Sequence, residues 1–481
     1  MKNVLAVAVA FSLAVPVLAQ EQVTPPPPAA PRQVNIPTPA EKTLANGLRV
    51  IVVQKKGLPL VAARLLVKTG SEADPADRGG LADMTGTLLI KGTTTKSSEE
   101  IARGVEALGA TMESGAGWDA SFVSLTSLST SFSQAMGYLA DVVRNPTFKK
   151  EELDRQRDQN LDAIRVAMQR PNSLANYVAA RVLFGTMPYG HNVGGTPESL
   201  PRITRDDLVS FHKRYYRPDN ALLVIAGDIE PRAAFDVVQK QLGGWKKSGG
   251  ALATITLKNA AAAPPSRVVV IDMPDAGQAA VVVARQGIRR VDPSYSVAEV
   301  ANSVLGGGYS ARLNQEIRIK RGLSYGARSG FDVRREIGPF TASAQTKNES
   351  AAEVAGIIID EIGRLGTVSV PESELTPRKA VLIGGFGRAL ETSAGLVNEI
   401  ADLALYGVSL SEIKRYVAGV QSVTAADVQK FATSNLGSSP SVIIVGDAKK
   451  FLEPLRQRFK DVEVIPLAEL DLSSPGLRRK K

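Results

Sequence analysis

Residues 221–228 read ALLVIAGD and residues 441–447 read SVIIVGD, so an apolar strand that ends in Gly-Asp occurs twice in the chain. Three further pairs of similar segments lie 218 to 220 residues apart. These pairs are residues 49–53 with 267–271, residues 74–75 with 292–293, and residues 204–208 with 424–428. Four matches at nearly one offset predict a duplicated domain, with one copy in each half of the chain.

Each copy has the pattern of a mixed α/β unit. Strands are predicted where apolar residues alternate or run together, at residues 48–54, 60–69 and 120–129. Helices are predicted from 3.6-residue periodicity at residues 80–91, 97–108, 131–144 and 150–169. Thr204 and Thr424 each precede an Asp by three residues, which indicates a capped helix start. We therefore predict an α+β fold with two homologous α/β sandwich domains, each an antiparallel-type sheet with helices on one face.

Composition marks four segments outside the two copies. Residues 1–20 combine Lys2, an apolar run and small residues near position 19, which is typical of a cleavable secretory signal peptide. Residues 21–40 are Pro-rich and predict an extended tether. Residues 246–266 resemble an interdomain linker, and residues 471–481 form a basic tail that we expect to be frayed. The two domains are accordingly predicted at residues 41–245 and 267–470.

The overall composition favours an exported globular protein. The 481 residues are 44% hydrophobic and 22% charged, and they include no Cys, so the fold depends on packing without disulfides. The signal peptide predicts a periplasmic location, and no later segment is apolar over the length of a membrane span. Half of the net charge of +10 comes from Lys2 and residues 478–481. No basic stripe is interleaved with aromatic residues, so nucleic-acid binding is not predicted.

Residues 79–93 read GGLADMTGTLLIKGT and resemble the zinc motif of the pitrilysin/insulinase (inverzincin) peptidases, G-L-x-H-x-x-E-H-x-x-x-K-G-T. In H-x-x-E-H, two His bind Zn²⁺ and the Glu polarises the attacking water. Asp83, Gly86 and Thr87 stand at those three places here. The frame of the motif is present, and the residues that would bind zinc and activate water are absent.

The position of the third zinc ligand supports the same conclusion. Residues 156–163 (QRDQNLDA) resemble the family pattern E-R-D-V-I-x-x-E, with Gln156 and Ala163 in place of its two Glu. The only His are His191 and His212, which we expect to be structural or solvent-facing rather than ligands. We predict no metal site in this chain and assign no acid/base role to the pair Asp83 and Asp158.

Residues 305–331 (LGGGYSARLNQEIRIKRGLSYGARSGF) carry a second motif. The pattern predicts a glycine loop with backbone angles closed to other residues, a helix over 310–320, a left-handed stop at Gly322 and a strand over 323–331. This block is similar to the family's L-G-G-G-x-S-S-R-L-x-x-x-x-R-x-x-x-G-L-x-Y. The resemblance implies that Arg318 and Tyr325 are catalytic and that the loop Gly306, Gly307, Gly308 contacts the substrate.

These residue types suit peptide hydrolysis. Arg offers planar donors to a peptide carbonyl, and Tyr offers its hydroxyl to the oxyanion of the tetrahedral intermediate. Taken singly, an Arg at the end of a helix also suits the helix dipole, and a strand Tyr also suits packing. The matched spacing of the whole block favours the catalytic interpretation.

The resemblance covers about residues 41–470 and is closest to the mitochondrial-processing-peptidase-like bacterial branch, in which one subunit can carry zinc and the other the Arg/Tyr pair. It implies that this chain is the non-zinc, substrate-binding subunit of a heterodimeric periplasmic zinc metallopeptidase that hydrolyses peptides. The zinc would belong to a homologous partner, and this chain would be inactive alone. The alternatives are an inactive scaffold or peptide-binding protein, and a homodimer with its own hydrolytic activity.

Overall fold

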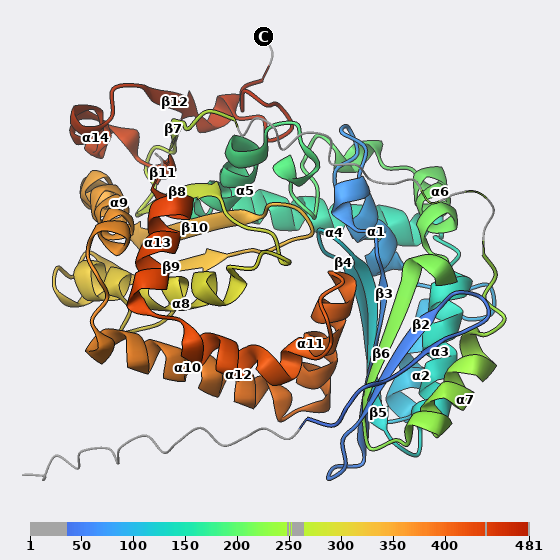
Figure 1. The fold of residues 1–481 in the computed structure, drawn as a ribbon. Helices are drawn as coiled ribbons and strands as arrows, with labels where there is room; N and C mark the ends of the chain where they lie inside the picture. The colour runs from blue at the N-terminus through green and yellow to red at the C-terminus, as the bar shows by residue number, and fades with distance from the viewer. Residues whose placement is uncertain (1–35, 248–249, 251, 253–263, 438–439, 480–481) are drawn as a thin grey trace, which may run out of the picture. The chain divides into compact units, whose positions relative to one another are not determined.

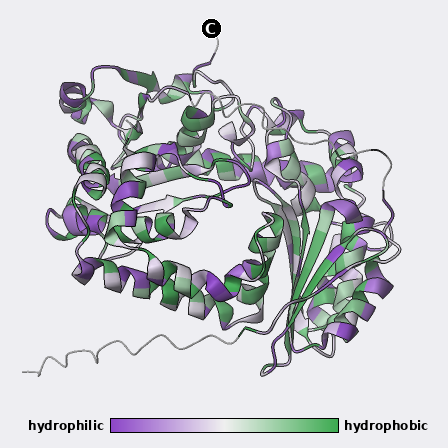
Figure 2. Cartoon of the chain, in the orientation of Figure 1, coloured by the Kyte–Doolittle hydropathy of each residue, from purple (hydrophilic) through white to green (hydrophobic). Residues whose placement is uncertain are grey.

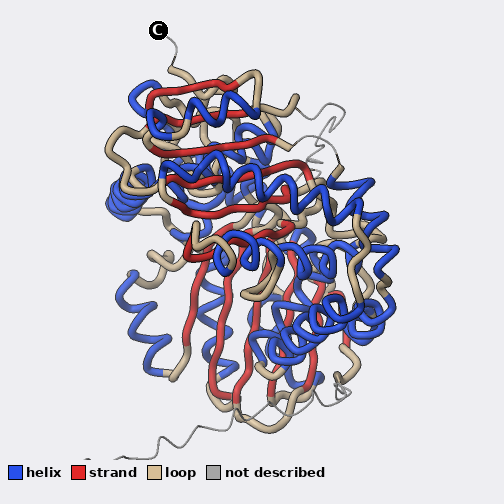
Figure 3. Tube along the Cα trace, turned by 90° about the vertical axis from the view of Figure 1, so that its left-hand side faces the viewer, coloured by secondary structure: helices blue, strands red, loops and turns tan. Residues whose placement is uncertain are grey.

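The computed structural model describes residues 36–247, 250, 252, 264–437 and 440–479, and these residues form two six-stranded sheets. The predicted signal peptide lies outside the described residues, as do most of the predicted tether and most of the predicted linker. Figure 3 shows the strands gathered in two separate groups. Each group is built from one half of the sequence, which agrees with a duplicated fold.

The first sheet has the order β1-β2-β6-β3-β5-β4. Its strands, in that order, are β1 (Ala40–Thr43), β2 (Arg49–Gln54), β6 (Ala221–Gly227), β3 (Leu60–Val67), β5 (Ser121–Leu128) and β4 (Thr111–Ala116). Strands β2 and β6 are parallel, with Arg49 opposite Leu222, and the other neighbours are antiparallel. Strand β4 forms one edge of this sheet.

The second sheet has the order β12-β7-β11-β8-β10-β9. Its strands are β12 (Val462–Pro466), β7 (Val268–Asp272), β11 (Ser441–Gly446), β8 (Ala279–Gln286), β10 (Pro339–Thr346) and β9 (Ser324–Phe331). The apolar strands β6 and β11 occupy the same third position and each has one parallel neighbour on the same side. The repeat in the sequence therefore corresponds to equivalent strands, and the predicted fold class is confirmed.

The four helices predicted in the first half are present, and their ends lie within three residues of the predicted ones (Figure 1). In the first half they are α1 (Leu81–Leu88), α2 (Ser98–Ala107), α3 (Phe132–Arg144), α4 (Lys150–Met168), α6 (Arg205–Tyr215) and α7 (Pro231–Leu242). In the second half they are α8 (Tyr295–Leu305), α9 (Ala351–Thr367), α10 (Glu372–Leu390), α12 (Glu412–Ser422), α13 (Ala425–Leu436) and α14 (Leu452–Arg458). Thr204 and Thr424 form the two predicted capping boxes, at the starts of α6 and α13.

Two helices cross between the halves and cover the second face of each sheet. Helix α5 (Pro171–Phe184) packs on β8 and β11, and helix α11 (Ser393–Leu405) packs on β3 and β6. Every residue of β6 and of β11 is buried as a result. Strands covered on both faces read as continuous apolar runs, which explains why ALLVIAG and SVIIVG do not alternate. In Figure 2 strand β6 is drawn largely in green, the hydrophobic end of the scale.

The end of the described chain is packed rather than frayed. Leu472 and Leu477 are buried beneath α5, and Arg478 pairs with Glu469 at 2.6 Å. The expectation of a frayed tail is therefore wrong up to residue 479, because apolar residues within the tail anchor it. Among the helices that the structure describes, none has both the length and the apolar character that a bilayer crossing requires.

Candidate functional site

Helix α1, which carries the altered zinc motif, is held at its start by a buried carboxylate. Asp74 accepts hydrogen bonds from the backbone N–H groups of Gly80 and Ala82, both at 2.8 Å. Its other neighbour is the ring of His191, whose Nε2 lies 3.2 Å from the Asp74 carboxylate. His191 is thus a structural residue, as predicted, and it helps to place α1.

Two of the three altered positions of the zinc motif, Asp83 and Gly86, face strand β4. Asp83 accepts a hydrogen bond from the backbone N–H of Ala116, and burial raises its pKa to about 6 with help from the charge of Asp74. A Cβ atom at Gly86 would lie 2.5 Å from the backbone carbonyl carbon and oxygen of Gly115. No side chain fits at Gly86 unless β4 moves. The position of the catalytic Glu therefore lacks a base and also lacks the space for one.

Helix α4 offers no ligand from the opposite side. The amide of Gln156 donates to Asn160 at 2.9 Å, and Asn160 Nδ2 lies 3.2 Å from the Met84 sulfur. Ala163 and Asp158 are exposed on α4. In the described residues there is no group of three His, Cys, Asp or Glu arranged to hold a metal. A thioether, amides and one buried, protonatable carboxyl do not fit zinc.

His212 is also structural. It lies in α6, its Nε2 is 2.8 Å from the carbonyl oxygen of Val143, and its ring stacks on Tyr216 with centroids 4.7 Å apart. Burial lowers the pKa of His212 to about 4, so its ring is neutral at pH 7. Both His of the chain are therefore engaged in packing and hydrogen bonds, as predicted.

A buried ionic network beside α1, which the sequence did not reveal, joins the two halves. Arg335 lies in the loop between β9 and β10 and donates to Glu72 at 3.1 Å and to the carbonyls of Asp119 and Lys68 at 2.8 and 3.2 Å. Burial raises the pKa of Glu72 to about 8, against the opposing charge of Arg335. The residues of this ionic network are far apart in the sequence, so no local sequence pattern could have indicated it.

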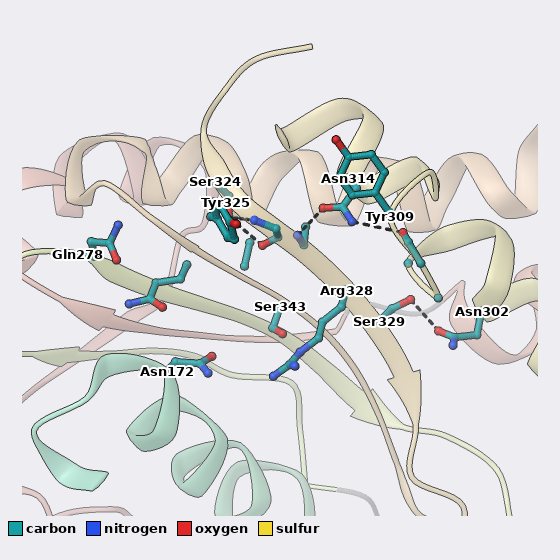
Figure 4. Close-up of a pocket in the computed structure, with 17 residues that line it drawn as sticks. Asn172, Gln278, Asn302, Tyr309, Asn314, Ser324, Tyr325, Arg328, Ser329 and Ser343 are labelled. Atoms are coloured by element: carbon teal, nitrogen blue, oxygen red, sulfur yellow. Dashed lines mark hydrogen bonds between the residues drawn. The ribbon is translucent and has the colours of Figure 1, made fainter. Parts of the chain in front are cut away.

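The glycine loop of the second half lines a cavity of about 810 Å³, together with Tyr309 and Tyr325 (Figure 4). The three glycines have different surroundings. A Cβ at Gly306 would lie 2.4 Å from the backbone nitrogen of Ser329, and one at Gly307 would lie 2.8 Å from Ser303 Cα. At Gly308 the nearest atom is 3.8 Å away, at the tip of Arg378.

The backbone angles of Gly306 to Gly308 differ from those that the sequence predicted for the glycine loop. None of the three glycines has a positive φ, so the expectation that they supply unusual backbone angles is wrong. Gly306 is needed for space: its carbonyl accepts the N–H of Ser329 at 3.1 Å and so covers the outer edge of β9. Gly322 does adopt the left-handed conformation predicted for it, with φ +61.

Arg318 lies in a π-helical segment, η5 (Asn314–Ile319), instead of the regular helix predicted for residues 310–320. The backbone N–H of Lys320 reaches the carbonyl of Gln315, five residues back, at 2.9 Å. The Asn314 side chain accepts the N–H of Ala327 at 2.7 Å and donates to Gly308 at 3.2 Å. Asn314 thus connects the helix, the glycine loop and β9, and a wide helical turn of this kind often marks a functional site.

The structure brings the side chains of Arg318 and Tyr325 together. The guanidinium carbon of Arg318 lies 4.5 Å from the ring centre of Tyr325 and 4.9 Å from that of Tyr309. Tyr325 is 88% exposed and lines the cavity. Exposed cation–π contacts are worth about 0.5–1 kcal/mol, so the pair is ordered without being needed for the core. Tyr309 is a member of this cluster that the sequence analysis did not single out.

Comparison with known proteins assigns both halves to one family. The family model "Insulinase (Peptidase family M16)" matches residues 49–190, and "Peptidase M16 inactive domain" matches residues 202–382. A solved structure of a peptidase M16 inactive domain from Pseudomonas fluorescens superposes with a TM-score of 0.80 at 30% identity, over 86% of this chain and 98% of that one.

More distant relatives align over a similar share of this chain. An uncharacterized zinc protease of Streptomyces coelicolor is 26% identical over 86% of this chain and 91% of its own length. The solved structure of a protease from Helicobacter pylori shares the fold, with a TM-score of 0.79 at 20% identity over 85% of this chain and 99% of that one. The similarity therefore spans both sheets.

Proposed function

Because this chain belongs to the insulinase family of peptidases, family M16, we propose that it is the non-zinc, substrate-binding subunit of a heterodimeric zinc metallopeptidase. A homologous partner subunit would hold the zinc and the base that activates water. This chain would supply Arg318 and Tyr325 and would be inactive alone. The predicted signal peptide supports a periplasmic location for the complex.

The observation that carries the proposal is the contrast between the two halves. The position of the catalytic Glu is closed by the backbone of Gly115, whereas Tyr325 is exposed at an open cavity and Arg318 lies against its ring. An unused Arg/Tyr pair would have no structural reason to persist, because Tyr325 contributes almost nothing to the core. The pair is accessible to a molecule that enters from outside.

The roles of the pair follow from their chemistry. The Arg318 guanidinium keeps its charge at any physiological pH and presents N–H donors to a peptide carbonyl. The Tyr325 hydroxyl can donate a hydrogen bond to the oxygen that becomes negative as the peptide carbon turns tetrahedral. The ring contact with Arg318 fixes the orientation of Tyr325, and Gly306 to Gly308 would lie along the path of an extended peptide. Neither side chain can activate water, so the reaction would depend on the partner.

The test is a peptide-cleavage assay on a complex of this chain with a homologous zinc-bearing subunit. Arg318→Ala and Tyr325→Phe should each lower kcat by roughly a hundredfold, the effect typical of one lost oxyanion donor, with unchanged thermal midpoints. Tyr138→Phe is the matched control, because Tyr138 also has a cation beside its ring, Lys96 at 5.7 Å, and does not line the cavity.

Two results would overturn the proposal. Unchanged turnover in both the Arg318 and the Tyr325 variants would show that the chain acts only as a scaffold. Chelator-sensitive cleavage by the isolated chain would show that it carries a hydrolytic centre of its own.

A further inference from the structure

The cavity beside the glycine loop has one charged side chain. Among its described lining residues, Arg328 is the only Lys, Arg, Asp or Glu. The other polar groups are neutral amides and hydroxyls, contributed by Asn172, Gln278, Asn302, Asn314, Ser324, Ser329, Ser343 and Gln345 together with the two Tyr. The interior of the recess is therefore suited to hydrogen-bonding a peptide and carries a single positive charge.

Arg328 lines this recess from the edge strand β9, where its side chain is exposed. Arg328 lies on β9 directly opposite Ser343 of β10, and both residues line the cavity. In Figure 4 the Arg328 side chain extends from β9 past Ser343 toward Asn172, at the start of α5. Helix α5 covers the neighbouring strands of this sheet face, so the recess begins where that cover ends.

Among the described residues, Arg328 has no anionic partner. Neighbouring cations are neutralised: Arg312 pairs with Glu374 at 2.8 Å, and Arg321 pairs with Glu316 at 2.5 Å. No ion pair or side-chain hydrogen bond of Arg328 occurs within the part of the chain that the structure describes. A guanidinium with its donors unused, in a recess without carboxylates, attracts a carboxylate from a ligand because two parallel N–H···O bonds can form.

We propose that this cavity selects peptides that carry a carboxylate, and that Arg328 is the residue that binds it. This inference rests on the proposed function only in taking a peptide as the occupant of the cavity. The carboxylate can belong to an Asp or Glu side chain or to the peptide's own C-terminus, since both present the same two oxygens. Arg328 is then a specificity-determining residue, distinct from Arg318 and Tyr325.

Binding to the full chain, without a partner and without cleavage, tests this proposal. The probes are three labelled nine-residue peptides of otherwise neutral sequence, measured by fluorescence anisotropy at low salt. One has a central Asp and an amidated C-terminus, one has Asn at that place with the same amide, and one has Asn with a free C-terminus. We expect at least one carboxylate peptide to bind roughly three- to tenfold more tightly than the neutral one.

Substitution identifies the residue responsible. Arg328→Gln should abolish the preference, and Arg328→Lys should keep part of it, because a charge remains without the planar fork. The matched control is Arg232→Gln, an exposed Arg on α7 in the other half, which should leave the preference unchanged. The thermal midpoint of each variant verifies that it is folded.

Equal binding of all three peptides by the native chain, no measurable binding of any of them, or a preference that survives Arg328→Gln would each overturn the proposal. These outcomes are separable from failure of the proposed function. A carboxylate preference in a chain that supports no cleavage with any zinc-bearing partner would refute the peptidase role alone. Cleavage that depends on Arg318, without any carboxylate preference, would refute the Arg328 site alone.

Discussion

Replacing Gly86 by Ala tests whether the zinc motif is closed by packing as well as by its missing ligands. The new Cβ would lie 2.5 Å from the carbonyl carbon and oxygen of Gly115, and these backbone atoms cannot turn away as a side chain could. Overpacking of this kind costs about 1–3 kcal/mol. The substitution also gains up to about 1 kcal/mol, because Ala favours a helix over Gly.

A matched control separates these two contributions. Gly137 lies within α3, and a Cβ there would meet nothing closer than the Gln241 amide at 3.7 Å. Gly137→Ala therefore gains helix propensity without a clash. The difference between the two variants is the cost of displacing β4, which we expect to be about 1–3 kcal/mol. Thermal unfolding should accordingly give a lower midpoint for Gly86→Ala than for Gly137→Ala.

Hydrogen exchange locates the effect. In Gly86→Ala the amides of β4, including the Ala116 N–H that is bonded to Asp83, should exchange faster than in the native chain, while those of Gly137→Ala stay protected. A zinc-binding assay on Asp83→His combined with Gly86→Glu and Thr87→His extends the test, and we expect no tight binding. Equal midpoints and equal β4 protection in the two Ala variants would refute the argument that β4 closes the motif.

Three further predictions concern Asp83, Gly306 and Arg335. Burial raises the pKa of Asp83 from 3.8 to about 6, so the native fold should lose about 3 kcal/mol of stability as the pH rises from about 4 to 6. In pH-dependent thermal scans, Asp83→Asn should remove this loss. The control Asp158→Asn, at an exposed position, should not change it. Gly306→Ala should lower both the thermal midpoint and peptide binding, because its Cβ would meet the backbone of β9 at 2.4 Å, and Gly308→Ala should leave the midpoint unchanged. Arg335→Ala should destabilise the protein more at a pH well above 8 than at pH 6, because the buried Glu72 carboxyl, with a pKa of about 8, is ionised only at the higher pH and then loses its opposite charge; an equal loss at both pH values in denaturant titrations would contradict this.

The fold was predictable from sequence because its signals are local and repeated. Continuous apolar strands, helical periodicity and the capping boxes at Thr204 and Thr424 each depend on a few neighbouring residues, and the duplication repeated some of these signals, including the Gly-Asp strand and the capping box. The exchange of α5 and α11 between the halves was not predictable. Neither helix was among the predicted segments, and helical periodicity would not say which sheet a helix covers.

The candidate site also has features that the sequence could predict and features that it could not. Arg318 and Tyr325 were singled out by the resemblance of their segment to the family's motif, and a helix end and a short turn bring the two side chains together. The contact of Gly86 with Gly115, the network of Glu72 with Arg335, and the position of Arg328 opposite Ser343 all join distant segments. Spacing within one segment carries no information about such contacts. The role of Gly306 was misjudged for the same reason, because its constraint comes from a strand more than twenty residues away.

The packing of β4 against α1 in the first half limits how a complex with a zinc-bearing subunit could work. With β4 packed against Gly86 and the Asp83 carboxyl bonded to Ala116, the surface around α1 is rigid and apolar where a zinc-binding subunit would need a hydrated, ligand-lined pocket. Opening it would break the α1–β4 packing and expose the carboxyl that burial keeps partly protonated. The second cavity needs no such change, since Tyr325 and Arg328 are already accessible. Substrate-induced assembly of a metal site within this chain is therefore disfavoured by packing, and binding at the second cavity can proceed on a surface that is already formed.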